Sequence, residues 1–227
     1  QKHKKNKMCV QTHHDSEKGS FGLPFSLSAF IPVRFFYPLI YHYYERYGIC
    51  MENNYLIVVD MQKDFVTGSL GSPEAAAVVP AVVKKISTFS GTVLFTKDTH
   101  GADYSETQEG QNLPVPHCIK GTDGWELIPE LASFAVSKEE PPVFEKGSFG
   151  SPELALWLLA AHKQNPISSI TLIGVCTDIC VVSNALLIKA FLPEVPIRVD
   201  ASCCAGVTKE KHEAALETMR SCQIDIM

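Results

Sequence analysis

Two cysteines lie four residues apart in the stretch IGVCTDIC, residues 173–180, which follows one apolar run and precedes another. Such a pair can form a disulfide, bind a metal ion, fill space in a core or supply a nucleophile. A disulfide between Cys176 and Cys180 is disfavoured in a reducing compartment, and this spacing alone gives zinc only two ligands. Core packing is the serious alternative, because free cysteine is among the most buried residue types. It is the preferred interpretation for the side chains of Cys118, Cys176, Cys203, Cys204 and Cys222.

Polar residues at the ends of the expected strands decide what Cys180 can do. Asp60 and Lys146 each end a strand-like run, and Cys180 follows a third run, in the first turn of a helix expected from Thr177. Because ligands of open parallel sheets bind beyond the carboxyl ends of the strands, these side chains can converge there. An ammonium and a helix N-terminus lower the pKa of a thiol, a carboxylate can take its proton, and unpaired N–H groups can hold an oxyanion. An aspartate at a strand end is also a common cap or turn residue.

The elements that must position these residues can be read from the apolar pattern. Nearly continuous, β-branched runs predict buried strands at 55–60, 92–98, 169–175 and 197–202, with a short strand at 143–145. Helical spacing predicts helices at 73–90, 151–164, 177–192 and 208–221, two of them with a Ser N-cap followed by Pro. The alternation predicts an α/β fold with three α/β/α layers, in which a mostly parallel sheet has helices on both faces. The loop-rich region 99–141 is long enough to be functional or mobile.

Composition limits the class of protein. The chain has 227 residues, of which 45% are hydrophobic and 20% charged, and its formal net charge is −5. This weak acidity argues against a nucleic-acid-binding surface, which needs clustered Lys and Arg. No apolar run approaches the roughly 18 residues of a membrane span. The eight cysteines are scattered and no signal peptide is evident, so a cytoplasmic protein with free thiols is expected.

Residues 1–50 differ from the rest of the chain. They open with a basic run and continue with an aromatic-rich stretch that contains Pro32, Arg34 and Pro38, which disfavours a helix or a membrane span. A membrane-surface or targeting extension is one interpretation. We favour the other, in which Met51 is the natural start, 1–50 is upstream sequence and 51–227 is the functional domain.

Four blocks of the sequence together resemble a known family. They are LIVVDMQKDF (56–65), TKDTH with PVPHCIKGT (96–100 and 114–122), VFEKGSFGS (143–151) and LIGVCTDICV (172–181). In this order they are similar to the isochorismatase-like cysteine hydrolases, most closely the nicotinamidase branch, over 54 to about 222. The resemblance implies the catalytic residues Asp60, Lys146 and Cys180. It also implies a cis peptide bond before Cys176 and an oxyanion hole formed by the N–H groups of Cys176 and Cys180, with Asp178 in a structural role.

The resemblance further implies a divalent metal ion that meets the pyridine nitrogen of the substrate. Asp98, His100 and His117 match three of the expected ligands, and two imidazoles with a carboxylate suit zinc first, or iron or manganese. For the further ligand, Glu106 and Glu109 are both available and spacing does not decide between them; Glu106 is preferred. The alternative is that Asp98 caps a turn and the histidines are exposed loop residues.

The implied activity is hydrolysis of a small amide, with nicotinamide as the leading substrate and a thioester as intermediate. Phe65 stands where the family has a ring-stacking aromatic, although core packing explains it equally well, and Phe149 can supply another pocket wall. An aromatic expected just before His117 is absent. A metal-independent amidase for another amide or ureido compound is therefore the near alternative, and an inactive binding protein the distant one. Homo-oligomers are common in this family, and no stretch identifies an interface.

Overall fold

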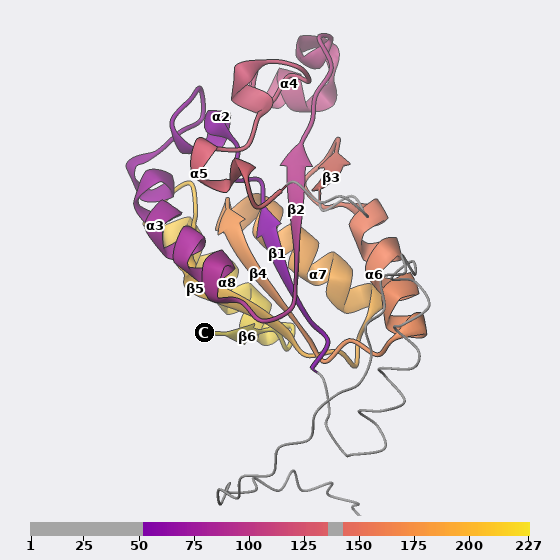
Figure 1. Ribbon diagram of the computed structural model, residues 1–227. Coiled ribbons are helices and arrows are strands. Elements are labelled where there is room, and N and C mark those ends of the chain that lie inside the picture. The colour runs from indigo at the N-terminus through magenta and orange to yellow at the C-terminus, as the bar shows by residue number, and fades with distance from the viewer. Residues whose placement is uncertain (1–51, 136–142) are drawn as a thin grey trace, which may run out of the picture. The chain divides into compact units, whose positions relative to one another are not determined.

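The expected alternation of strands and helices is present in the computed structural model, which describes residues 52–135 and 143–227 (Figure 1). The expectations about residues 1–50 and Met51 lie outside the described residues. The described strands are β1 (Asn54–Val59), β2 (Thr92–Asp98), β3 (Val143–Lys146), β4 (Ser169–Val175), β5 (Ile197–Ala205) and β6 (Asp225–Ile226). The longer helices are α3 (Pro73–Thr88), α6 (Pro152–Gln164), α7 (Val182–Phe191) and α8 (Lys209–Ser221). Short helical segments are α2 (Lys63–Val66), η2 (Tyr104–Glu106), α4 (Gln108–Asn112), η3 (Asp123–Trp125), α5 (Pro129–Ala132) and the π-helical turn η4 (Thr177–Val181).

The strands form one parallel sheet in the order β3-β2-β1-β4-β5-β6. In chain order the strands run from β1 at the centre through β2 to β3 at one edge, and then return to β4 on the other side of β1. In such sheets ligands usually bind where the strand order reverses, which here is at the carboxyl ends of β1 and β4. The predicted fold class is confirmed.

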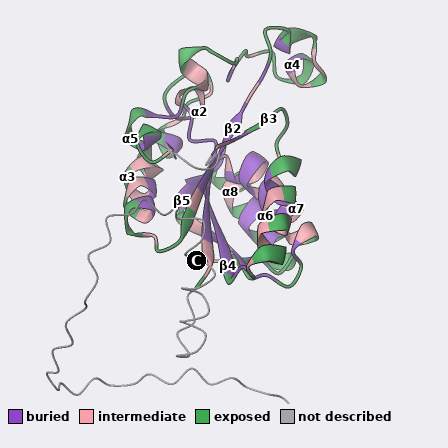
Figure 2. Ribbon diagram, turned by 45° about the vertical axis from the view of Figure 1, so that its right-hand side comes forward, coloured by how far each residue is buried: buried purple, intermediate pink, exposed green. Residues whose placement is uncertain are grey.

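Helices cover both faces of the sheet, which explains the continuous apolar strands. Leu154 of α6, Ile188 of α7 and Leu216 of α8 belong to one hydrophobic cluster with one face of the sheet. Val82 and Ile86 of α3 belong to a second cluster with the opposite face. All residues of β4 are buried, as expected for a strand with helices on both sides (Figure 2). In Figure 1 the strand arrowheads point toward the end of the domain that carries α2 and α4.

Helix starts follow the predicted capping chemistry, and most element bounds shift by only a few residues. The Ser72 and Ser151 hydroxyls accept hydrogen bonds from the backbone N–H groups of Ala75 and Leu154, at 3.0 and 3.2 Å. The expected helix at 177–192 begins as the wider π-helical turn η4, which contains Cys180, and continues as α7. The two-residue strand β6 was not predicted, since it has no apolar run of its own. Among the described residues, no helix is both long and apolar enough to cross a membrane.

Candidate active site

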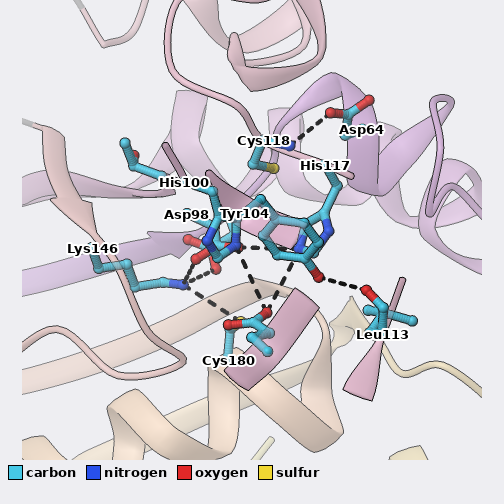
Figure 3. Close-up of polar contacts among 12 residues, drawn as sticks. Asp64, Asp98, His100, Tyr104, Leu113, His117, Cys118, Lys146 and Cys180 are labelled. Carbon is cyan, nitrogen blue, oxygen red and sulfur yellow. Dashed lines mark hydrogen bonds and ion pairs between the residues drawn. The ribbon is translucent and has the colours of Figure 1, made fainter. Parts of the chain in front are cut away.

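Three polar side chains meet at the carboxyl edge of the sheet, in the arrangement expected from the sequence. Figure 3 shows two of them, Lys146 and Cys180. Asp60 follows β1, Lys146 is the last residue of β3, and Cys180 lies in η4 after β4. The Lys146 Nζ atom lies 2.7 Å from Asp60 Oδ2 and 3.6 Å from Cys180 Sγ. All three side chains are buried. A thiol, a carboxylate and an ammonium therefore share one site that is screened from bulk water.

Burial controls the protonation of this group. Burial raises the pKa of the Cys180 thiol well above its ordinary value, and the neighbouring Asp60 charge raises it further. Burial alone would lower the pKa of Lys146, but the Asp60, Cys180 and Asp98 charges outweigh it and raise that pKa, so the ammonium stays charged. Burial also raises the pKa of Asp60, which makes its carboxylate a better proton acceptor. At rest the Cys180 thiol therefore keeps its proton.

Asp60 is held by its own backbone and by β2. Its φ angle is +47°, a left-handed conformation that aspartate tolerates better than most residues. The Thr96 hydroxyl donates to Asp60 Oδ1 at 2.6 Å, and the Asp60 N–H donates to the Thr96 carbonyl at 3.3 Å. Since Thr96 is fully buried, these bonds fix the direction of the carboxylate toward Lys146.

The segment that carries Cys180 has an irregular backbone. The Val175–Cys176 peptide bond is cis, as the resemblance implied. The Cys176 carbonyl accepts from the N–H groups of Ile179 and Val181, at 3.1 and 3.0 Å, which closes the π-helical turn η4. π-helical turns are frequent at functional sites. The expected structural role of Asp178 agrees with its contact, since its Oδ1 atom accepts from the Val207 N–H at 2.9 Å.

The cysteines other than Cys180 mostly occupy the packing positions expected for them. The six cysteines of the described ranges, Cys180 included, are all free thiols. Cys118, Cys203 and Cys204 are buried, and Cys176 is partly buried. Cys222 corrects the prediction, because it caps the C-terminal end of α8 and is exposed.

Four residues beside the Asp60–Lys146–Cys180 group face one another as metal ligands would. They are Asp98, His100, Glu109 and His117, whose potential ligand atoms all lie within 4.8 Å of one another. Asp98 Oδ2 is 2.9 Å from His100 Nε2 and 3.6 Å from His117 Nε2. Both histidines are buried, so they are not the exposed loop residues of the alternative interpretation.

Glu109, and not the preferred Glu106, completes this group. Glu109 Oε1 lies 3.7 Å from His100 Nε2 and 3.8 Å from His117 Nε2. The chain forms η2 and then restarts as α4 at Gln108, which brings Glu109 in the first turn of α4 to the histidines. Glu106 ends η2 and is exposed. The short helices were not visible in the spacing, and spacing alone therefore did not separate the two glutamates.

The donor set fits a divalent cation. His117 Nδ1 is 2.8 Å from the Val115 carbonyl, and a proton on Nδ1 that donates to it leaves the Nε2 lone pair facing the group. Burial would raise the pKa of Asp98, but hydrogen bonds from His100 and His117 hold it well below its ordinary value, so the carboxylate is ionised. Tetrahedral ligands about 2.1 Å from an ion are about 3.4 Å apart, close to most of the separations here. Two imidazoles and two carboxylates suit zinc, iron or manganese.

Three residues that support these ligands were not assigned roles from the sequence. Gln62, fully buried, accepts from the Asp98 N–H at 2.7 Å and donates to the Asp98 carbonyl at 2.8 Å. Tyr104 places its ring edge-on to His100 and His117, at centroid distances of 4.8 and 5.1 Å. Asp64 accepts from the N–H of Cys118, the residue after His117, at 2.8 Å. The only signal for Gln62 and Asp64 was their place in the VVDMQKDF block.

The two predicted substrate-binding aromatics differ in their surroundings. Phe65 is buried, belongs to the α3-side hydrophobic cluster, and has its ring centroid 5.4 Å from that of His117. It therefore packs in the core and also borders the metal-ligand group. Phe149 is 44% exposed in the loop after Lys146. Its carbonyl accepts a hydrogen bond from Asn184 Nδ2 at 3.1 Å.

Comparison with known proteins identifies the family of this chain. Residues 54–227 match the Isochorismatase domain. The chain belongs to the isochorismatase family. It is 31% identical over 186 residues to a nicotinamidase/pyrazinamidase of Mycobacterium tuberculosis, covering 76% of this chain and 97% of the relative. It is 26% identical over 204 residues to a nicotinamidase of Schizosaccharomyces pombe, covering 76% and 91% of the two chains.

Solved structures of this family agree with the fold. The pyrazinamidase of Pyrococcus horikoshii, in complex with zinc, is 28% identical with a TM-score of 0.63, over 77% of this chain and 98% of that one. The pyrazinamidase/nicotinamidase of Streptococcus mutans is 27% identical with a TM-score of 0.64, over 77% and 100%. The isochorismatase-like hydrolase fold predicted from the sequence is therefore confirmed.

Proposed function

We propose that this protein hydrolyses nicotinamide to nicotinate and ammonia, with Cys180 as the nucleophile. The family domain and the curated nicotinamidase relatives indicate a hydrolase that acts on an amide C–N bond. The observation that supports the substrate and mechanism most strongly is one piece of geometry. The Asp60–Lys146–Cys180 group contacts the Asp98–His100–Glu109–His117 group directly, because Lys146 Nζ lies 3.1 Å from Asp98 Oδ1.

The first half of the reaction forms a thioester. Asp60 takes the proton of the Cys180 thiol while the sulfur bonds to the carboxamide carbon. Lys146 stabilises the thiolate as it forms, and the N–H groups of Cys176 and Cys180 hold the negative carbonyl oxygen. The C–N bond then breaks, and Asp60 gives its proton to the departing nitrogen, which leaves as ammonia.

The second half releases the acid. Asp60 takes a proton from water, and the resulting hydroxide adds to the thioester carbon. The same two N–H groups hold the oxyanion again. The C–S bond breaks, Asp60 returns the proton to the sulfur of Cys180, and the carboxylic acid product leaves and loses its own proton to water.

Asp98, His100, Glu109 and His117 would hold a divalent metal ion, zinc by preference. When bound, the ion would take the pyridine nitrogen as a ligand and so position the ring in the site. Phe65 beside His117 is placed to stack on the substrate ring, and Phe149 to border the opening. These residues orient the carboxamide toward Cys180 and exclude water from the thiol.

The absent aromatic before His117 favours a second candidate within the same reaction class, an amidase for another small amide or ureido compound. A substrate panel separates the two. The purified protein is assayed for ammonia release from nicotinamide, pyrazinamide and a set of ureido compounds, before and after chelation and zinc restoration. We expect nicotinamide to be hydrolysed fastest, with activity lost on chelation and restored by zinc. Preference for a compound without a ring nitrogen, unaffected by chelation, would replace nicotinamide with the alternative.

A further inference from the structure

Lys146 must reach the nucleophile from a distant part of the sheet. It ends β3, which among the described strands lies at the sheet edge and pairs with β2 alone, whereas Cys180 follows β4. Adjacent strands are about 4.8 Å apart, so β3 and β4 are separated by about 14 Å. A four-residue edge strand held on one side is a weak support for the ammonium that must lie beside the thiol. The ion pairs with Asp60 and Asp98 hold the ammonium itself, and a contact between the loop after β3 and η4 would also fix the backbone that carries it.

Asn184 supplies such a contact. It lies in α7, one helical turn after Cys180, and is fully buried. Its Nδ2 atom donates to the Cys180 carbonyl at 2.8 Å and to the Phe149 carbonyl at 3.1 Å. Its Oδ1 atom accepts from the Ser151 N–H at 3.0 Å. All three of these hydrogen bonds go to backbone atoms of the turn that carries Cys180 and of the loop after Lys146.

The loop after Lys146 is also packed closely against α7. A Cβ atom added at Gly150 would lie 3.4 Å from a side-chain carbon of Leu187 and 3.5 Å from the Ser183 carbonyl. Ser151 then caps α6 through its hydroxyl while its N–H is held by Asn184. The loop from Gly147 to Ser151 is thus fixed at both its α6 end and its α7 side.

Asparagine is an unfavourable residue for a buried position in a helix. Asparagine is a weak helix former, and a buried amide costs free energy unless it is fully hydrogen-bonded. An apolar residue would pack in the core next to Ala185 and Ile188 without that cost. The Asn184 amide therefore fixes the relative positions of the backbone groups that it binds, at a cost in stability.

We propose that Asn184 is a positioning residue, which couples the loop after Lys146 to the turn that carries Cys180 and thereby keeps the ammonium beside the thiol. This rests on the proposed role of Lys146 in activating Cys180. Asn184 touches neither substrate nor the reacting atoms, and it acts through the backbone of Cys180, Phe149 and Ser151.

The test measures the reactivity of Cys180 without any substrate. Iodoacetamide alkylation is followed by mass spectrometry of peptides, with the exposed Cys222 as internal reference. Asn184→Ala and the nearly isosteric Asn184→Leu are made in the wild-type protein and in a Lys146→Met background. We expect each to slow Cys180 alkylation about tenfold in the wild-type protein and to change it less than about twofold when Lys146 is absent. The rate at Cys222 stays constant.

The control is Asn53→Ala, which removes a side-chain tether to the Asn165 carbonyl far from the site. It should lower thermal stability and leave the Cys180 rate unchanged. Equal slowing by Asn184→Ala in both backgrounds, or unchanged alkylation in either folded single variant, would overturn the proposal. If the coupling is found but the wild-type protein releases no ammonia from nicotinamide, the substrate is wrong and the role of Asn184 stands.

Discussion

Lys146 is the residue on which the electrostatics of the site depend. Its ammonium lies 2.7 Å from one buried carboxylate, Asp60, and 3.1 Å from another, Asp98. Without it, two negative charges remain close together and away from water. Removing one partner of a buried ion pair leaves an uncompensated charge, which is far more costly than breaking an exposed pair.

We therefore predict that Lys146→Ala lowers the free energy of unfolding by about 3–5 kcal/mol, measured by urea denaturation of the metal-free protein. The matched control is Arg220→Ala, which removes an exposed ion pair with Glu217 and should cost less than about 1 kcal/mol. Equal losses for the two variants would show that the Lys146 charges are not buried as described.

The two glutamates of the loop give a direct test of the metal-ligand group. Glu109→Gln removes a carboxylate that lies 3.7 Å from His100 Nε2, and bound zinc should decrease by a factor of about ten or more. Glu106→Gln changes an exposed carboxylate three residues away and should leave the zinc content unchanged. Metal analysis after dialysis against limiting chelator measures both. Loss of zinc in the Glu106 variant alone would restore the original sequence preference.

The sequence could predict that Asp60, Lys146 and Cys180 meet, because each stands at or just after the end of a strand and the carboxyl ends of parallel strands share an edge. Their catalytic roles rest on the family resemblance and stay predictions. Glu109 could not be separated from Glu106, because the choice depends on where η2 ends and α4 begins. Asn184 had no signal at all, since two of its three partners are backbone atoms of a loop more than thirty residues away.

At the scale of elements, the pairing of β1 with β4 brings Asp60 and Cys180 to one place. Gly174 pairs with Val59, the residue before Asp60. Its φ angle is +116°, and an added Cβ atom would lie 2.1 Å from the Val59 carbonyl oxygen. Only glycine allows the two strands to approach here, directly before the Cys176–Cys180 turn.

Gly174→Ala should therefore separate the strand ends and abolish activity, with a loss in stability of at least about 3 kcal/mol. Gly121→Ala is the matched control, because Gly121 also has a positive φ, +84°, but an added Cβ atom would meet nothing within 4 Å. It should cost about 1–2 kcal/mol from backbone strain alone. Chemical denaturation measures both variants, and a stable, active Gly174→Ala would contradict this account of the β1–β4 junction.

The strands and long helices could be predicted from periodicity because they are buried on one or both faces. The π-helical turn η4 and the strand β6 could not. The turn depends on local hydrogen bonds to the Cys176 carbonyl, and β6 depends on pairing with β5. Neither has a periodic apolar pattern in the sequence.

At the scale of the whole molecule, the site lies entirely within the family domain. Every residue to which we assign a role falls between Asp60 and Asn184, and the domain match begins at residue 54. We therefore predict that removal of residues 1–50 changes kcat and KM by less than about twofold, since a domain with its own core folds independently. Steady-state assays of the two chain lengths test this, and loss of activity in a folded shorter chain would assign 1–50 a working role.

The central claim is that the thiol of Cys180 hydrolyses nicotinamide, and one comparison tests it most directly. Ammonia and nicotinate formed from nicotinamide are measured for the wild-type protein, Cys180→Ser and the exposed-thiol control Cys222→Ser. We predict that the wild-type protein and Cys222→Ser each form ammonia and nicotinate in equal amounts. For Cys180→Ser we predict a loss of at least about 1,000-fold in kcat. Retention of activity by a correctly folded Cys180→Ser would contradict the mechanism proposed for this site.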